Sequence, residues 1–195
     1  MQRKTTPKVK DGRVQKKNRH SKTENYWNTR QDVLLLDKES PGKGYKHFLK
    51  RRDIIEFLEI LPNWKEIDIE LDAIVLASGG DSDGWYYNGV IGICAWEKNM
   101  TRSLGKDYFN QHLELFKKLE LEYEIKKETA ICHFNEKQIK AFQLLHILLH
   151  ELGHHYDRIT TKQKSRSSRG EKYAESYAEK YETIIWNKYF EMIEN

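Results

Sequence analysis

The stretch LLHELGHHYDRIT, residues 148–160, places a glutamate and three histidines on one short segment of helical apolar periodicity. Its leucines continue an apolar face that begins at Phe142, because residues three and four apart lie on the same side of an α-helix. Asn135 and Gln138 have the spacing of a helix-capping pair. We therefore expect one helix from Asn135 to about Ile159, with its leucine face in the core.

A second stripe on the same helix collects polar side chains, namely Gln143, His146, His150, His154 and Asp157. Histidines four apart place their imidazoles one turn above each other, so His150 and His154 can reach one zinc ion. Glu151 lies at the edge of this stripe, where a carboxylate can deprotonate a zinc-bound water without being a ligand itself. The His-Glu-x-x-His spacing therefore predicts a catalytic zinc site with Glu151 as general base.

The remaining polar residues of this helix are not expected to be metal ligands. His146 lies one turn before His150, and we expect it to support the ligands from behind or to pack in the core. Asp157 follows His154 by one turn, so it is expected to anchor that imidazole or Arg158. His155 lies off the metal stripe and is expected to be exposed or bonded to a neighbour.

A catalytic zinc site needs a third protein ligand, with the fourth position left for water. The chain has Thr160 six residues after His154, which excludes a third histidine at that spacing. The segment SSRGEKYAESYAEKYETIIWNKYF, residues 167–190, has helical periodicity. One stripe of it alternates carboxylates with small apolar side chains: Glu171, Ala174, Glu175, Ala178, Glu182 and Ile185. The alanines predict that this helix approaches the first one closely.

This combination resembles the gluzincins, zinc metallopeptidases in which a glutamate helix downstream of the His-Glu-x-x-His motif supplies the third ligand. It is most similar to the compact ImmA/IrrE-type members, which typically carry Glu-x-x-Ala-(Asn/Asp/Glu)-x-(aromatic or aliphatic)-Ala. The segment Glu171–Ala178 matches that pattern in full, and the resemblance spans about residues 136–185. It implies a zincin-like fold with Glu171 as the third zinc ligand, and Glu175 as the acid that orients a ligating histidine.

The choice of third ligand has an alternative. A frame shifted by four residues starts at Glu175, but it replaces the second alanine of the pattern by Glu182. Ser168 and Glu171 also have the spacing of a helix capping box, which would engage Glu171 in the helix terminus. Glu171 is the ligand favoured by the full pattern, and Glu175 is the alternative.

The rest of the body predicts an α+β domain with a small mixed sheet and packed helices. Strand patterns occur at residues 32–37, 71–80, 122–127 and 129–134, and an Asn88-Gly89 turn predicts a hairpin within residues 85–96. Helical patterns occur at residues 45–61 and 107–119. We also expect residues 129–134 or 90–96 to offer an open strand edge to an extended peptide.

The N-terminal segment differs in composition from this body. Residues 1–30 carry ten Lys/Arg and two acidic residues, whereas the remainder carries 24 basic and 28 acidic residues. Residues 1–25 have almost no aliphatic side chains, so we expect a disordered basic tail there and a single domain over residues 26–195. Clustered Lys/Arg can contact nucleic acid through its phosphates, although such a tail can also serve only for solubility.

The sequence has neither a secretory signal pattern nor an apolar run long enough to span a bilayer, which predicts a cytoplasmic protein without a membrane partner. Cys94 and Cys132 lie in apolar segments, as buried free thiols of a reducing compartment do. The expected function is a zinc metallopeptidase, a hydrolase acting on a protein or peptide. The alternative is a cytoplasmic nucleic-acid-associated regulatory protein whose zinc site is structural or inactive.

Overall fold

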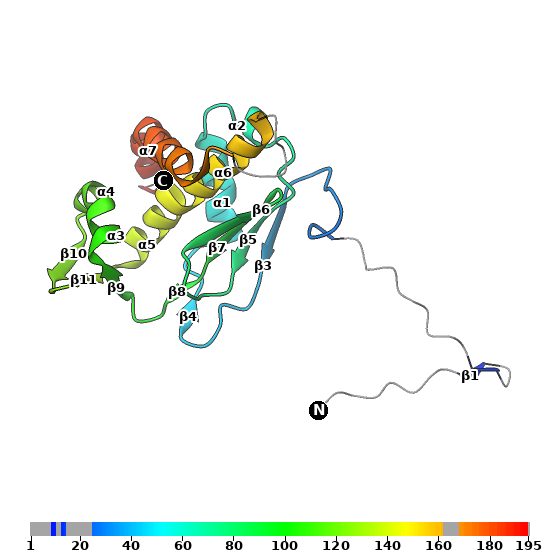
Figure 1. Cartoon of the computed structure of the whole chain (residues 1–195), viewed down its shortest axis with the longest axis horizontal. Coiled ribbons are helices and arrows are strands. Elements are labelled where there is room, and N and C mark those ends of the chain that lie inside the picture. Colours follow the sequence, from blue (N-terminus) through cyan, green and yellow to red (C-terminus); the bar gives the residue numbers. More distant parts are fainter. Residues whose placement is uncertain (1–8, 11–12, 15–24, 162–167, 195) are drawn as a thin grey trace.

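The computed structural model describes residues 9–10, 13–14, 25–161 and 168–194, and it has the α+β architecture expected from the sequence. Small sheets pack against helices, with the long C-terminal helix crossing over the helix that carries the histidine motif (Figure 1). None of the helices in the described part of the chain combines the length and apolar content needed to cross a bilayer.

The main sheet has four strands in the order β3 (Leu35–Lys38), β5 (Ala73–Ala77), β7 (Val90–Cys94) and β6 (Gly84–Tyr87). The first three are parallel, and β6 returns antiparallel to β7 through the expected hairpin. Asn88 and Gly89 have φ values of 46° and 90°, which a two-residue hairpin turn requires. This arrangement leaves β6 as an edge strand of the sheet.

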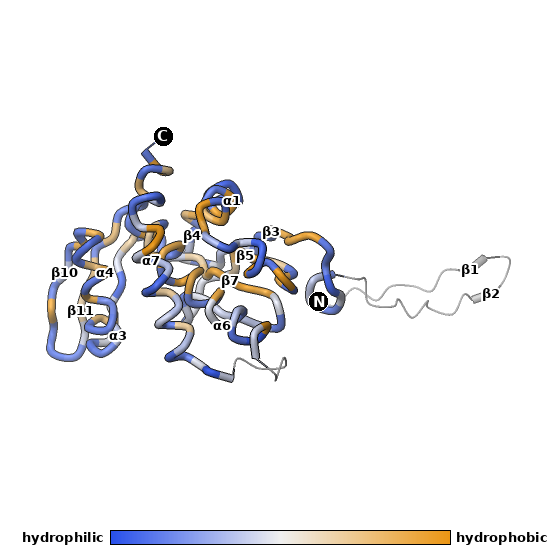
Figure 2. The backbone as a smooth tube through the Cα atoms, turned by 90° about the horizontal axis from the view of Figure 1, so that it is seen from above, coloured by the Kyte–Doolittle hydropathy of each residue, from blue (hydrophilic) through white to orange (hydrophobic). Residues whose placement is uncertain are grey.

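The two faces of this sheet bury different side chains, because successive residues of a strand point to opposite sides. Large aliphatic residues such as Ile74 and Ile91 face the helices and join the main core. Small residues such as Ala73 and Val90 face the other way, where Tyr26 covers them together with Trp85. Figure 2, coloured by residue hydropathy, shows β5 and β7 as hydrophobic segments in the middle of the body.

One long helical segment carries the motif in three parts, α5 (Glu136–Phe142), the π-helix η1 (Gln143–Leu148) and α6 (Leu149–Thr160). The predicted start is confirmed, because Asn135 and Gln138 each accept a hydrogen bond from the other's backbone N–H. The π-helical turn was not predicted from the sequence. The C-terminal helix α7 (Gly170–Glu194) packs along α6 and η1, and α1 (Arg51–Ile60) packs on α7.

A second sheet lies to one side, with the antiparallel order β10 (Glu122–Ile125), β11 (Thr129–His133) and β9 (Thr101–Gly105). Two short helices, α3 (Lys106–Gln111) and α4 (Leu113–Lys118), connect β9 to β10. The predicted single helix over residues 107–119 is therefore interrupted, and the interruption falls at His112.

The remaining elements are short. Strand β4 (Tyr45–Lys46) pairs with β8 (Trp96–Glu97), so the helix predicted over residues 45–61 begins only at Arg51. Helix α2 (Trp64–Ile67) follows α1. Both cysteines are buried free thiols, as expected.

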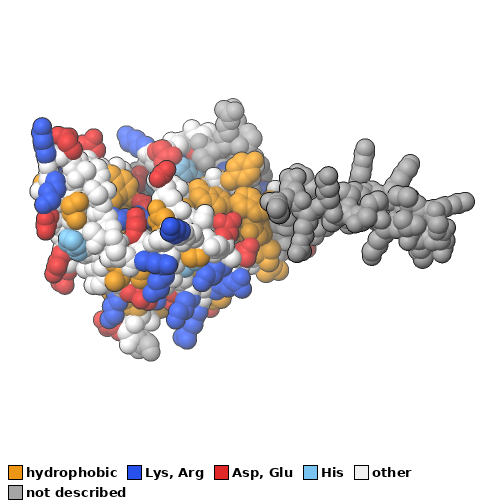
Figure 3. Space-filling view, turned by 90° about the horizontal axis from the view of Figure 1, so that it is seen from below, with side chains coloured by type: hydrophobic (Ala, Val, Ile, Leu, Met, Phe, Trp, Pro, Cys, Tyr) orange, Lys and Arg blue, Asp and Glu red, His pale blue; other side chains and the backbone are white. Residues whose placement is uncertain are grey.

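The predicted basic tail, residues 1–25, lies almost wholly outside the described residues. Its described parts are Asn25 and two short strands, β1 (Val9–Lys10) and β2 (Arg13–Val14), which pair antiparallel where the sequence predicted disorder. On the body, Figure 3 shows Lys/Arg and Asp/Glu side chains interspersed over one face. The described part of that face is thus not a surface of a single charge sign.

A partly buried hydrogen-bond network ties the sheet to the end of α6. The Tyr86 hydroxyl, on β6, accepts hydrogen bonds from the backbone N–H of Gly89 and from Nε of Arg158. His155 is fully buried, and its Nε2 lies 3.0 Å from the backbone carbonyls of Ile67, the last residue of α2, and of Ile69. Carbonyls only accept, so Nδ1 of His155 is unprotonated and accepts the Tyr86 hydroxyl proton at 3.2 Å. The expectation that His155 is exposed is therefore wrong, and the alternative that it is hydrogen-bonded to a neighbour is confirmed.

This network gives a stability prediction for Tyr86→Phe. The substitution removes one hydroxyl and leaves buried donors of Gly89 and Arg158 without their acceptor, so we expect a loss of about 1–3 kcal/mol in the free energy of unfolding. Tyr87→Phe is the matched control because Tyr87 is 60% exposed on the same strand. Urea unfolding of both variants measures the difference, and equal midpoints would contradict the network.

Candidate metal centre

Helices α6 and α7 touch through their backbones at one point. A Cβ added to Gly153 would lie 2.8 Å from the Cα of Ala174 and 3.0 Å from the Cβ of Tyr177. No side chain fits in that space, so glycine on α6 and a fully buried alanine on α7 are what the crossing requires. The close approach brings the first turn of α7 beside His150 and His154.

At this crossing, His150, His154 and Glu171 point their donor atoms at one another. Nε2 of His150 lies 3.2 Å from Nε2 of His154 and 3.1 Å from Oε2 of Glu171. Nε2 of His154 lies 3.4 Å from Oε1 of Glu171. These atoms therefore form a three-donor group that could hold one metal ion.

The protonation of His150 shows why this group suits a cation. Nδ1 of His150 lies 3.1 Å from Oε2 of Glu175. A carboxylate accepts, so in the neutral imidazole Nδ1 carries the proton and the lone pair of Nε2 faces the carboxylate of Glu171. Two acceptors facing each other need a cation between them, and either a metal ion or a second proton on His150 meets that need.

The electrostatics of the two histidines differ although they are neighbours. Burial lowers the pKa of His150, but the hydrogen bond to Glu175 and the nearby carboxylates outweigh burial and leave that pKa above its ordinary value. Burial and the adjacent His150 lower the pKa of His154. The two rings therefore differ in their preference for a proton, because nearby carboxylates favour charged His150 whereas burial beside His150 disfavours charged His154.

Glu151 lies beside this group without joining it. Its side chain is 7% exposed, and Oε1 packs against Gly84 of β6, where an added Cβ would lie 2.9 Å away. Among the described residues its carboxylate has no hydrogen-bond or ion-pair partner. Burial raises the pKa of Glu151 to about 7, with the charge of His150 opposing that rise. A carboxyl in this condition is able to accept a proton near neutral pH.

The group opens into a cavity of about 1010 Å³. Strand β6 and the loop before it form one wall, and α6 with the start of α7 forms the other. Asp83, in that loop, is held by hydrogen bonds from Arg102 and from the Tyr108 hydroxyl. The cavity wall opposite the histidines is thus fixed by a buried arginine.

The strands expected to offer an open edge do not do so. Residues 90–96 contain β7, which lies between β5 and β6, and residues 129–134 contain β11, which lies between β10 and β9. The edge strand that lines the cavity is β6. A strand with partners on both sides has no free backbone edge, so the sequence-based expectation was wrong on this point.

The other expected site residues occupy defined places. Asp157 is buried and accepts a hydrogen bond from the backbone N–H of Arg169, so it holds the segment that leads into α7. This arginine contact was not predicted from the sequence. Tyr173 and Tyr177, which lie on α7 near Glu171 and Glu175, are not among the residues that line the cavity. His146 is buried and does line it.

A second group of donors, not predicted as a site, lies next to the first. Nε2 of His146 lies 2.8 Å from Nε2 of His112, which in turn lies 3.7 Å from Oε1 of Glu175. The sequence indicated only that His112 shares a helical face with the apolar residues Phe109 and Phe116, which predicts an inward-facing side chain. Nothing in the spacing connects it to His146, which is 34 residues away.

Comparisons with protein-family models, with curated proteins and with solved structures found no match to this chain. The residues of the site offer a three-donor group, a carboxylate beside it and an open cavity over both.

The crossing at Gly153 gives a test of what holds the group together. Gly153→Ala adds a methyl group where the backbone of Ala174 already lies, so we expect a loss of about 1–3 kcal/mol in the free energy of unfolding from overpacking. Metal affinity should fall as well, because α7 carries Glu171. Gly80→Ala is the control, since an added Cβ there meets nothing within 4 Å.

Denaturant unfolding of the metal-free protein and metal titration measure the two effects. Alanine is intrinsically the better helix former by about 1 kcal/mol, so a stabilised Gly153→Ala variant would show that the helices do not touch here.

Proposed function

We propose that this protein is a zinc-dependent metallopeptidase with a zincin-like arrangement, in which His150, His154 and Glu171 bind zinc. Two ligand atoms bound to one tetrahedral zinc ion at roughly 2.0–2.1 Å lie about 3.3 Å apart. The three donor pairs of the group have separations of 3.2, 3.1 and 3.4 Å. This agreement is the observation that carries the proposal, and it favours Glu171 over Glu175 as the third ligand.

Glu175 supports the proposal in its other expected role. Its Oε2 accepts the Nδ1 proton of His150, which fixes the tautomer that presents Nε2 to a metal. Histidine ligands of zinc commonly have such a carboxylate behind them. Glu175 thus serves as the group that orients His150.

The number of protein donors favours a catalytic site over a structural one. Structural zinc sites have four protein ligands, whereas catalytic sites have three and leave one position for water or substrate. The group here has three donors and borders an open cavity. The alternative of a nucleic-acid-associated protein depends on the basic tail, which lies almost wholly outside the described residues.

Zinc, when bound, supplies a Lewis acid that acidifies water and stabilises the charge developing on a substrate carbonyl oxygen. Glu151 then accepts a proton from the attacking water and delivers it to the leaving amine. Its place in the cavity wall, its burial and its lack of a partner among the described residues suit that role. In the metal-free protein, burial raises the pKa of Glu151 to about 7, so its carboxyl can exchange a proton near neutral pH.

Strand β6 is the proposed site for the substrate backbone. Backbone hydrogen bonds alternate along an antiparallel pair, and Cys94 donates from its N–H to the carbonyl of Asp83. In that register the backbone N–H and C=O groups of Trp85 face β7, whereas those of Gly84 and Tyr86 face the free edge. An extended peptide can pair with those groups by β-augmentation, and Gly84 would then place it beside Glu151.

Glu151→Gln tests the catalytic role. The amide keeps the size of the side chain but cannot act as a base, so we expect retained zinc with peptide cleavage reduced by about 10²–10⁴-fold. Glu179→Gln is the matched control, because Glu179 lines the same cavity from α7 outside the three-donor group. Mass spectrometry of a library of unstructured peptides, incubated with each zinc-loaded protein, reads the cleavage. Equal cleavage by wild type and Glu151→Gln would refute the role of Glu151.

Glu171→Gln tests the choice of third ligand. Removal of a ligating carboxylate should weaken zinc binding by more than the roughly 10–100-fold that is typical for loss of an orienting partner. Glu175→Gln should therefore cost less affinity than Glu171→Gln. Competition with a chromophoric chelator measures both affinities, with each substitution made in a His112→Asn chain so that only the group at His150 is read. The reverse order would assign Glu175 as the ligand.

A further inference from the structure

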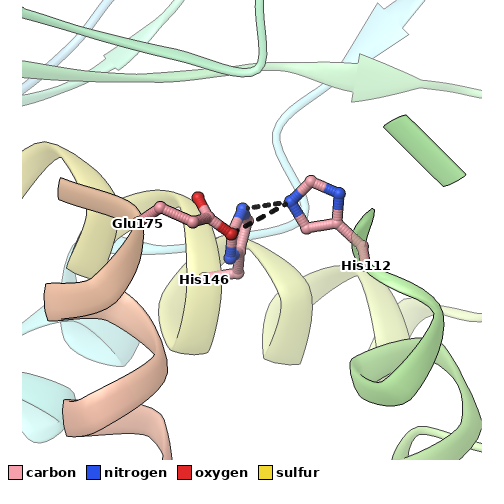
Figure 4. Close-up of side chains that lie close together, drawn as sticks. All are labelled: His112, His146 and Glu175. Atoms are coloured by element: carbon pink, nitrogen blue, oxygen red, sulfur yellow. Dashed lines mark hydrogen bonds and ion pairs between the residues drawn. The ribbon is translucent and has the colours of Figure 1, made fainter. Parts of the chain in front are cut away.

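His112, His146 and Glu175 form a second group of donor atoms that the peptidase proposal does not use as ligands. Each comes from a different element: His112 from the junction of α3 and α4, His146 from η1, and Glu175 from α7. Figure 4 shows the three side chains pointing at one another across the space between these elements. Their donor atoms all lie within 4.8 Å of one another.

The hydrogen bonds around His112 set which of its nitrogens faces the group. Nδ1 of His112 lies 2.7 Å from the backbone carbonyl of Tyr108. A carbonyl only accepts, so Nδ1 is protonated and the lone pair of Nε2 points at His146 and Glu175. A carbonyl behind a histidine is the arrangement that orients metal-ligating histidines in proteins.

The separations in the group come close to those of a bound ion. Nε2 of His112 lies 2.8 Å from Nε2 of His146 and 3.7 Å from Oε1 of Glu175. Tetrahedral coordination at about 2.0–2.1 Å requires about 3.3 Å between ligand atoms, so a shift of about 0.5 Å suffices at each of these two pairs. The donor atoms of His146 and Glu175 lie within 4.8 Å of each other. The π-helical turn that contains His146 gives a second indication, because such turns are frequent at functional sites.

The surroundings of the group suit a bound cation. Both imidazoles are buried and pack against aromatic rings, with Phe142 stacked on His146 and Tyr108 tilted over His112. A cavity of about 180 Å³ borders all three donors and leaves room for a water molecule as fourth ligand. Neutral histidines with a carboxylate are ligands that divalent first-row transition metals accept.

We propose that His112, His146 and Glu175 bind a second divalent transition-metal ion. Zinc is the probe for this site. Glu175 then connects two centres, with Oε1 on the second ion and Oε2 on Nδ1 of His150. In the metal-free protein the Nε2–H of His146 donates a hydrogen bond to Nε2 of His112. Metal binding at Nε2 of His146 requires the tautomer that carries this proton on Nδ1 instead. The second centre needs none of the three ligands of the first.

The experiment is a zinc titration of the metal-free full chain, followed by dialysis and elemental analysis. We expect about two zinc ions per wild-type chain and about one in His112→Asn. His133→Asn is the matched control, because His133 is exposed on β11 and belongs to neither group, and it should retain about two. Circular dichroism establishes that each variant is folded.

The outcomes separate the second centre from the proposed peptidase site. A wild-type chain that binds a single zinc, lost in His154→Asn and retained in His112→Asn, would overturn the second centre and leave the first intact. A single zinc lost in His112→Asn and retained in His154→Asn would support the second centre and refute the first. If His112→Asn does not fold, wild-type stoichiometry together with His154→Asn still decides, because a folded His154→Asn chain without zinc overturns the proposal.

Discussion

The contact between Gly153 and Ala174 is the constraint on which the rest of the site depends. Because neither residue has a side chain beyond Cβ, the backbones of α6 and α7 approach to the limit that sterics allow. A glutamate side chain is short, and only at this separation does Glu171 reach the two histidines of α6. Asp157 reinforces the crossing from the other side by holding the segment before α7.

The charges of the site form one connected arrangement. Glu175 faces His150 with one oxygen and His112 with the other, so a single carboxylate orients both histidine groups. Glu151 is set apart from this arrangement on the side of β6, where Gly84 leaves room for its carboxylate. Two acids in one cavity therefore have different surroundings, because one has imidazole partners and the other has none among the described residues.

Much of the fold followed from local patterns. The helix that begins at Asn135, the Asn88-Gly89 hairpin and the strand at residues 73–77 all formed where periodicity and turn chemistry indicated. The errors concern features that neighbours decide. The helix predicted from residue 45 begins six residues later because its first residues pair with β8, and the strand edges were misassigned because sheet order is a long-range property.

The sequence by itself determined the contents of the first group, since the spacing of His150 and His154 and the Glu-x-x-Ala-Glu pattern at Glu171 are local and helical geometry fixes their faces. Only the tertiary structure decided which strand lines the cavity and that His112 meets His146. Those relations join residues tens of positions apart through packing, and packing between distant segments leaves no periodic trace in the sequence.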